Sequence, residues 1–216
     1  MKVLVFDTET TGLPESRNTS ILETEKWPHI VQISWITYDT ETGNYVVADH
    51  IIDCGVDIPQ ESVNIHGISK KISERKGENL WEVMNKFDTA LIECDMVIGH
   101  NISFDKRVYM VEAIRNRRRQ YFTRDGVRKP EYCTMKKSKE FCNIMKTNSK
   151  GETYLKYPSL SELHDKIFGF IPKGTHDSMA DVLICLRCFC ILEGNEDVIK
   201  SNRNLKRIYE LYCGNC

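Results

Sequence analysis

The sequence predicts an α/β or α+β fold in which helices cover the faces of one sheet. Three observations lead to this expectation. Strand-like runs form a meander within the first 52 residues, helices and short strands alternate after residue 77, and a length of 216 residues suits one domain better than two. In sheets of this class, polar residues at strand ends are where function collects.

The N-terminal part supplies the predicted meander. Residues 2–6 are a short β-branched run that ends at Asp7 and a turn, as expected for a buried central strand. Residues 30–38 alternate between apolar and polar positions, and a turn-forming segment separates them from a further strand-like run at 45–52. These runs predict three sequential strands.

Helices and strands alternate in the remainder of the chain. Apolar residues at spacings of three and four indicate the amphipathic helices. Ser103 is a candidate helix cap, and Ser159 with Glu162 forms a capping box at the start of another helix. The remaining elements are expected at 77–93 (helix), 96–99 (strand), 104–114 (helix), 133–135 (end of a strand), 145–157 (exposed hairpin or loop), 177–194 and 196–212 (helices).

The composition is that of a soluble globular protein. Hydrophobic residues make up 41% of the chain and charged residues 28%, which disfavours a disordered chain or a fibrous repeat. No apolar stretch approaches the ~20 residues of a membrane helix, and the apolar run after Met1 is too short for the core of a secretion signal. We therefore expect an intracellular protein, cytoplasmic or nuclear, with no membrane partner; its oligomeric state stays unknown.

Charge is distributed unevenly along the chain. Residues 106–139 carry twelve Lys or Arg against three acids, whereas residues 1–105 carry eight against eighteen. The formal net charge of -1 hides this division. A basic segment beside a cluster of carboxylates is typical of a protein that holds a polyanion.

The nine cysteines are expected to be reduced thiols and not a disulfide scaffold. Cys185–Cys188 and Cys213–Cys216 have the C-x-x-C spacing of zinc ligands, but the 24 residues between the pairs exceed the usual ~15–20. Cys185 and Cys188 also share a predicted helical stripe with Asp181 and core residues. We interpret them as buried structural thiols, with a zinc site as the alternative.

Acidic residues stand where the predicted strands end. Asp7 and Glu9 are two apart, so the period of a strand puts both on one face. Two like charges so close are costly unless a cation lies between them, and the pair is either solvated or a site for a hard metal ion. Asp105 follows the next buried strand, and Asp181 lies one turn into a late helix, five residues after His176. Taken singly, each would be an ordinary cap, dipole partner or surface residue.

Three segments together resemble the motifs of the DnaQ-like family of 3′-to-5′ exonucleases, in its DEDDh subgroup. They are 6–13 (FDTETTGL), 100–105 (HNISFD) and 176–181 (HDSMAD), in the family's order. The resemblance covers about residues 1–193, so 194–216 would be a C-terminal helical extension packed on the same domain. It implies an RNase H-like fold, with a five-stranded mixed sheet flanked by helices.

The resemblance also implies hydrolysis with two divalent ions, Mg²⁺ or Mn²⁺. Asp7, Glu9 and Asp181 would hold the ion that activates water, and Asp7 with Asp105 would hold the second. Carboxylates suit both cations, and two ions ~4 Å apart stabilise the attacking and leaving oxygens at phosphorus. His176 would be the general base, a role that imidazole chemistry suits.

Residues after the first strand are expected to bind substrate. By resemblance, Thr10, Gly12 and Leu13 would receive the 3′-terminal nucleotide, with His66 and Asn101 nearby. Ordinary turn packing is an equal alternative for Leu13.

Arg115, Arg117, Arg118 and Arg119 form the centre of the basic segment. They are expected to follow the phosphates upstream of the cleaved end, without base specificity. The alternative is a solvated helix end, which a run of charge alone would favour; the exonuclease motifs shift the expectation toward a phosphate track.

These observations predict a metal-dependent 3′-to-5′ exonuclease that releases nucleoside monophosphates from single-stranded or frayed DNA ends. A ribonuclease that trims RNA is the alternative among enzymes, since only contacts to the 2′-hydroxyl separate the two. A catalytically inactive module that binds nucleic acid or a polymerase is the alternative from another class, and the presence of all four acids and the histidine argues against it. Proofreading in trans with a DNA polymerase, DNA repair and end degradation remain equally open.

Overall fold

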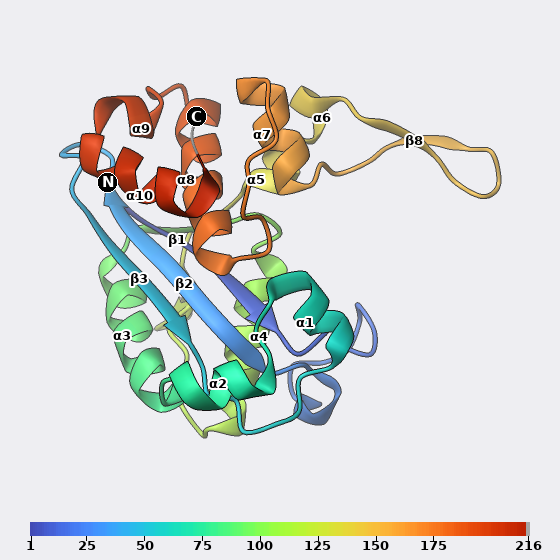
Figure 1. Ribbon diagram of the computed structural model, residues 1–216, viewed down its shortest axis with the longest axis vertical. Coiled ribbons are helices and arrows are strands. Elements are labelled where there is room, and N and C mark those ends of the chain that lie inside the picture. Colours follow the sequence, from blue (N-terminus) through green and yellow to red (C-terminus); the bar gives the residue numbers. More distant parts are fainter. Residues whose placement is uncertain (215–216) are drawn as a thin grey trace.

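The apolar residues of the first strand place it at the centre of a five-stranded mixed sheet. The computed structural model describes residues 1–214. The strand order is β3-β2-β1-β4-β7, with β2 antiparallel to β1 and β3, and with β4 parallel to both β1 and β7. The strands are β1 (Lys2–Thr10), β2 (Ile30–Asp39), β3 (Tyr45–Ile51), β4 (Met96–Gly99) and β7 (Glu131–Cys133). The expected RNase H-like α/β architecture is confirmed (Figure 1).

Helices cover both faces of this sheet. The described helices are α1 (Gln60–His66), α2 (Lys70–Lys76), α3 (Leu80–Glu93), α4 (Ser103–Arg115), α5 (Thr134–Lys137), α6 (Lys139–Cys142), α7 (Leu160–Phe168), α8 (Ser178–Leu192), α9 (Val198–Ser201) and α10 (Arg203–Cys213), with a 3-10 turn η1 (Thr24–Lys26). Two small hairpins complete the described elements, β5 (Thr123–Arg124) with β6 (Val127–Arg128), and β8 (Met145–Thr147) with β9 (Thr153–Leu155).

Alternation along β1 divides the core in two. Val3 and Val5 are buried with residues of α7, α8, α9 and α10, whereas Leu4 and Phe6 are buried with residues of α3 and α4. Every side chain of β1 up to Phe6 that enters the core is at most 1% exposed. A strand covered on both faces is expected to read as a continuous apolar run, which is what residues 3–6 are.

The meander, the helix at α3 and the strand β4 agree with the sequence expectation, with shifted boundaries. The first strand continues past residue 6 to Thr10, so that Asp7 and Glu9 lie within it. Helix α3 begins at Leu80 because the Asn79 side chain accepts from two backbone N–H groups there. Glu78, just before that cap, forms an isolated parallel bridge with Ile52, which lies beyond β3.

Other expectations need correction. Ser103 is the first helical residue of α4 and caps nothing, since Ile102 takes the cap position without a side-chain bond. Strand β7 ends at Cys133, and Thr134 begins helix α5. The chain forms two helices, α9 and α10, where a single helix was expected over 196–212. The Asn202 side chain accepts from the N–H groups of Asn204 and Leu205 and so caps α10 as a separate helix. The short helices α1 and α2 were not expected at all.

The capping box and the hairpin were expected. At the start of α7, the Glu162 N–H donates to the Ser159 hydroxyl and the Ser159 N–H donates to the Glu162 carboxylate, so the capping box is complete. Strands β8 and β9 form a hairpin that projects from the body of the molecule in Figure 1. Across the described residues, none of the helices has both the length and the apolar character that a bilayer-spanning segment requires.

Candidate active site

Strand parity directs the first two acids of the site. Asp7 and Glu9 have the same parity as Val3 and Val5, so they point to the face of the sheet that α8 covers. Both side chains are half-buried. Thr8 points to the opposite face, where its N–H and hydroxyl donate to Asp105 Oδ1 at 3.1 and 2.8 Å.

The other two acids come from the first turns of two helices. Asp181 lies in the first turn of α8 and Asp105 in the first turn of α4. Asp7, Glu9 and Asp181 each present an oxygen within 4.8 Å of the others. Asp105 is 3% exposed, and its charge contributes to the raised pKa of Asp7. The structure therefore brings Asp7, Glu9 and Asp181 together, with Asp105 near enough for its charge to act on Asp7.

The electrostatics of this cluster disfavour four ionised carboxylates. Burial, then the charges of Asp105, Asp181 and Glu9, raise the pKa of Asp7 well above its usual value. Burial and the Asp181 charge raise the pKa of Glu9 to about 8. Burial raises the pKa of Asp105 to about 7 against the hydrogen bonds from Thr8, and the pKa of Asp181 to about 7. A cation between the carboxylates would remove this cost.

The donor set fits divalent cations of the hard class. Four carboxylates converge, and Asp181 Oδ1 is buried without a hydrogen-bond partner, although a buried carboxylate oxygen ordinarily has one. Its other oxygen, Oδ2, accepts from the backbone N–H of His176 at 3.2 Å. An unpartnered anionic oxygen facing two further carboxylates is the arrangement that Mg²⁺ or Mn²⁺ would satisfy.

His176 lies beside this cluster in the loop between α7 and α8. Its side chain is exposed and its backbone is left-handed, with φ 72°. That conformation is uncommon for residues other than glycine and asparagine, so it requires support from the surroundings. Asp177, the next residue, caps α8 by accepting from the N–H groups of Met179 and Ala180.

The expected substrate-binding residues gather around the end of β1. Thr10 Oγ1 donates to the Gly12 carbonyl at 2.6 Å, which shapes the turn after the strand. His66 ends α1 close to the backbone of Thr10, and its Nε2 is buried without a hydrogen-bond partner. Leu13 is 81% exposed, so ordinary turn packing does not account for it.

A cavity of about 620 Å³ opens beside this turn. Leu13 and Asn101 line it, as does Arg107, which the sequence analysis placed in the basic segment, together with Pro14, Arg17, Trp27, Ser103, Phe104, Met135 and Tyr157. Apolar and aromatic side chains with two arginines are a suitable lining for nucleotides, since bases stack and phosphates pair with guanidinium groups. These residues come from five separate parts of the chain, so no local pattern could have identified them.

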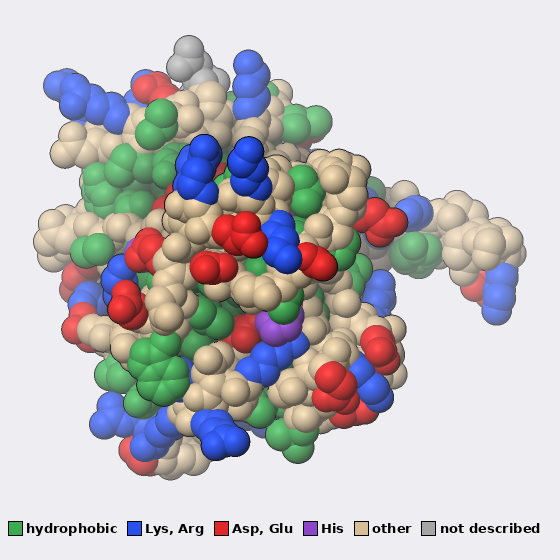
Figure 2. Space-filling model, turned by 60° about the horizontal axis from the view of Figure 1, so that its bottom comes forward, with side chains coloured by type: hydrophobic (Ala, Val, Ile, Leu, Met, Phe, Trp, Pro, Cys, Tyr) green, Lys and Arg blue, Asp and Glu red, His purple; other side chains and the backbone are tan. Residues whose placement is uncertain are grey.

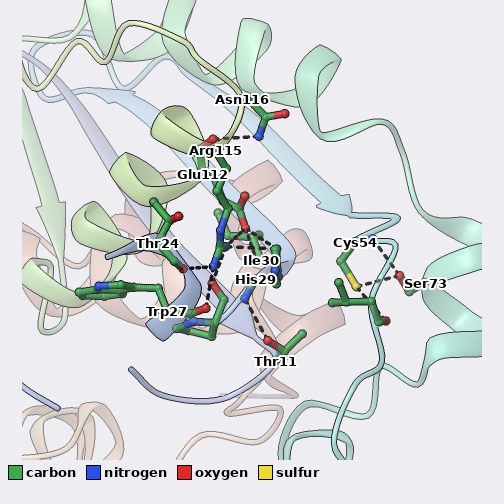
Figure 3. A network of polar contacts seen from close by, with 12 residues as sticks. Thr11, Thr24, Trp27, His29, Ile30, Cys54, Ser73, Glu112, Arg115 and Asn116 are labelled. Atoms are coloured by element: carbon green, nitrogen blue, oxygen red, sulfur yellow. Dashed lines mark hydrogen bonds and ion pairs between the residues drawn. The ribbon is translucent and has the colours of Figure 1, made fainter. Parts of the chain in front are cut away.

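The arginine segment requires a correction. Arg115 donates to the carbonyls of Thr24, Trp27 and Pro28 and pairs with Glu112 at 2.8 Å, with its side chain 15% exposed (Figure 3). Arg118 pairs with Asp88 at 2.8 Å, lies over the Trp81 ring, and is 9% exposed. Both guanidinium groups are occupied within the chain, so Arg115 and Arg118 do not face a nucleic acid.

Arg117 and Arg119 are exposed but lie away from the acids. They follow the last turn of α4, whereas Asp105 stands in its first turn, roughly 15 Å away along the helix axis. Arg119 also lies 4.0 Å from Asp125. The face drawn in Figure 2 carries basic and acidic side chains interspersed, and not one continuous basic patch.

The cysteines of α8 are core residues. Cys185 and Cys188 are at most 2% exposed, and burial raises the pKa of both thiols. Cys213 is buried as well, with its thiol directed to the Ala180 carbonyl at 3.8 Å. Cys216, the fourth residue of the zinc alternative, lies outside the described residues.

Comparison with known proteins agrees with this geometry. A family model described as Exonuclease (RNase_T) matches residues 4–189. The structure of E. coli exonuclease I in complex with a dA16 oligonucleotide aligns with a TM-score of 0.64 at 19% identity, over 97% of this chain and 42% of that chain. A moderately thermophilic exonuclease I from Methylocaldum szegediense aligns with a TM-score of 0.64 at 17% identity, over 97% and 42%.

These structural likenesses show the fold. The chain spans less than half the length of the exonuclease I structures that it matches. A comparison with curated protein sequences finds no match.

Proposed function

This chain belongs to the exonuclease (RNase_T) family of the DnaQ-like superfamily, and from this membership we propose that it is a metal-dependent 3′-to-5′ exonuclease acting on single-stranded or frayed DNA ends. The observation that carries the proposal is the convergence of Asp7, Glu9 and Asp181 within 4.8 Å, with Asp181 Oδ1 unpartnered. A structural role would pair these charges with a cationic side chain, as the ion pairs elsewhere in the chain do.

The carboxylates have the role of holding two divalent ions. Asp7, Glu9 and Asp181 would bind one ion, and Asp7 with Asp105 the other. When bound, such ions supply positive charge to the reacting phosphate and make a nucleophile available at neutral pH. Thr8 orients Asp105 through two hydrogen bonds to one oxygen, which leaves the other oxygen of that carboxylate for the site.

His176 would accept the proton of the attacking water. Its exposed imidazole is in the loop directly ahead of α8, and its own N–H donates to Asp181 Oδ2. The backbone bond therefore links the position of the base to an acid of the metal site. A positioned general base ordinarily contributes ~10²–10⁴-fold to the rate.

The cavity beside Leu13 is suited to the 3′-terminal nucleotides. Leu13 and Phe104 offer apolar faces, while Asn101 and Ser103 offer polar groups at the start of α4. Thr10, Gly12 and His66 lie near the end of β1 and would complete the pocket for the terminal residue. E. coli exonuclease I, which shares the fold, has been solved with dA16 and dT13 oligonucleotides.

Upstream phosphates would meet Arg17, whereas Arg107 would shape the cavity, because its guanidinium group is occupied within the chain as those of Arg115 and Arg118 are. Arg17 is exposed on the cavity rim. Arg107 is half-buried, lies over the Trp27 ring at 4.5 Å, and donates to the carbonyls of Arg17 and Thr19. Arg117 and Arg119 remain candidates only for a strand long enough to reach the far end of α4.

One assay separates the outcomes. Oligonucleotides labelled at the 5′ end, as single-stranded DNA, as duplex DNA with a mismatched 3′ end and as RNA, are incubated with Mg²⁺ or Mn²⁺. The proposal expects stepwise shortening of the 5′-labelled DNA, loss of activity with EDTA, and none in an Asp7→Asn variant. Preferential shortening of RNA would identify the exoribonuclease alternative, and a single internal cut or activity without metal would contradict the proposal.

A further inference from the structure

The loop that carries His176 has little internal structure to fix it. Residues 169–177 connect α7 to α8, and three of them, Gly169, Gly174 and His176, have left-handed backbones with φ 79°, 75° and 72°. The one backbone hydrogen bond recorded within the loop runs from Asp177 N to Gly174 O at 3.1 Å. The position of His176 therefore depends on contacts to other elements.

Asp181 of α8 accepts from the His176 N–H and His164 of α7 donates to the Phe170 carbonyl, and the last turn of α10 supplies further contacts between these two points. Lys173 N donates to the Cys213 carbonyl at 3.1 Å. The backbone of Gly174 packs so closely on the Tyr212 carbonyl that a Cβ at this glycine would lie 2.2 Å from that oxygen. The Lys173 side chain packs along Gly214. Figure 1 shows α10 next to α8 and the segment that leads into it.

The same turn is fixed to the sheet and to α8. The Tyr212 hydroxyl donates to Asp49 Oδ2 at 3.0 Å, and Asp49 Oδ1 accepts from Gln32 at 2.9 Å and Ser34 at 2.8 Å. The Cys213 thiol lies 3.8 Å from the carbonyl of Ala180, the residue before Asp181. One helical turn thus contacts both the loop of the base and the helix of a metal-site acid.

We propose that the last turn of α10, residues 212–214, positions the general base: through Lys173 and Gly174 it sets where His176 lies relative to Asp181. This inference rests on the function proposed above for His176. The family model matches only as far as residue 189, so the positioning segment lies outside the matched domain. Gly174 and Tyr212 are positioning residues, since neither lies among the acids or lines the cavity.

The decisive variant is Gly174→Ala, and Gly169→Ala is its matched control. Both glycines belong to the same loop, with φ 75° and 79°, so both substitutions carry the same backbone strain. Only at Gly174 would the new methyl group meet the Tyr212 carbonyl, because nothing lies within 4 Å of a Cβ at Gly169. We expect Gly174→Ala to lower kcat by up to ~10²-fold with KM little changed, since displacement of a catalytic group by ~1 Å has that effect. Gly169→Ala should stay within about 3-fold of wild type.

A second measurement tests whether the effect passes through the base. In a His176→Asn background, Gly174→Ala should lower kcat no further, because the group it displaces is already gone. An additional full loss in that background would show that the substitution damages the metal site or the fold, and would overturn the inference. If His176→Asn itself leaves kcat unchanged, the role of His176 in the proposed function fails, which is a separate result.

Tyr212→Phe keeps the test informative if Gly174→Ala does not fold. It removes only the hydroxyl that donates to Asp49 and leaves the ring and the α10 backbone in place. We expect a loss in kcat of about 3-fold, again absent in the His176→Asn background, with the midpoint of thermal unfolding measured in parallel. Wild-type kcat in a folded Tyr212→Phe protein, or equal losses in both backgrounds, would contradict positioning by α10.

Discussion

The buried cluster around Arg187 and the acidic cluster at the end of β1 differ in whether their charges are compensated. Arg187 of α8 and Asp197, which caps α9, form an ion pair at 2.8 Å with side chains 4% and 6% exposed. His164 contacts this pair through its Nε2, which lies 3.3 Å from Arg187 Nη1 and 2.9 Å from the Tyr209 hydroxyl, while its Nδ1 donates to the Phe170 carbonyl at 2.9 Å. Burial lowers the pKa of His164, which matches a neutral ring in this setting.

The acidic cluster at the end of β1 has the opposite character. No Lys or Arg pairs with Asp7, Glu9, Asp105 or Asp181 among the ion pairs of the described residues, and one oxygen of Asp181 is unpartnered. The Arg187 cluster contributes to folding, whereas the acids cost folding free energy that a bound cation would return. The comparison therefore separates a compensated cluster from the uncompensated acids to which we assign the chemistry, and each prediction below tests one side of it.

The largest effect is expected at the acids. Asp7→Asn should lower the rate by at least about 10³-fold, equivalent to ~4 kcal/mol, because it removes the carboxylate shared by both proposed ions. The same substitution removes a repelling charge, so the metal-free protein should melt at the same temperature or higher. Turnover of a labelled oligonucleotide and thermal unfolding check both halves. A variant that melts lower yet stays active would place Asp7 with the structural residues.

His176→Asn is expected to lower kcat by ~10²–10⁴-fold. Asparagine is the suitable replacement because it tolerates the left-handed backbone at this position, where φ is 72°. Binding of an oligonucleotide and the midpoint of thermal unfolding should stay at wild-type values, since the side chain is exposed. Unchanged turnover would remove His176 from the mechanism.

Substitutions in the cluster of Arg187 and Asp197 should lower stability and leave activity nearly unchanged, which is the reverse of the result expected at the acids. Arg187→Met leaves Asp197 buried without its partner and should cost ~3–5 kcal/mol of unfolding free energy. For a chain of this length that is a fall of about 10 °C in the melting midpoint. Activity per folded molecule, measured well below the midpoint, should be near wild type. Arg187→Met/Asp197→Leu should recover part of the loss, because no unpaired charge then remains buried.

The contrast also explains what the sequence could predict. Asp7 and Glu9 are two apart on a strand, and His176 and Asp181 are five apart at a helix start. The resemblance of the three segments to the exonuclease motifs, and not the spacing alone, led to their prediction as site residues. The sequence shows that a side chain is charged but not which way it points. In the same run of arginines, Arg115 faces the interior and Arg117 faces solvent.

The lining of the cavity was beyond local reasoning. Trp27, Arg107 and Tyr157 are brought together only by the tertiary fold. The seven-residue helices α1 and α2 were also missed, because so short a helix shows too few apolar repeats to recognise.

The smallest effect is the pH dependence of stability in the metal-free protein. The folded-state pKa values of Glu9, Asp105 and Asp181 are raised to about 8, 7 and 7, above those of the unfolded chain. A carboxyl group whose pKa is raised by folding contributes stability that is fully present below its pKa in the unfolded chain, near pH 4. That stability is lost as the pH rises through its pKa in the folded protein. In EDTA, the melting midpoint should therefore fall by about 5 °C between pH 5.5 and 8.5.

Mg²⁺ should restore the melting midpoint at pH 8.5 and do little at pH 5.5, because at the lower pH protons occupy the carboxylates that would bind the ion. Asp181→Asn should flatten the fall in EDTA, while a flat profile in the wild type would mean that the four acids are already compensated in the metal-free protein, as Asp197 is.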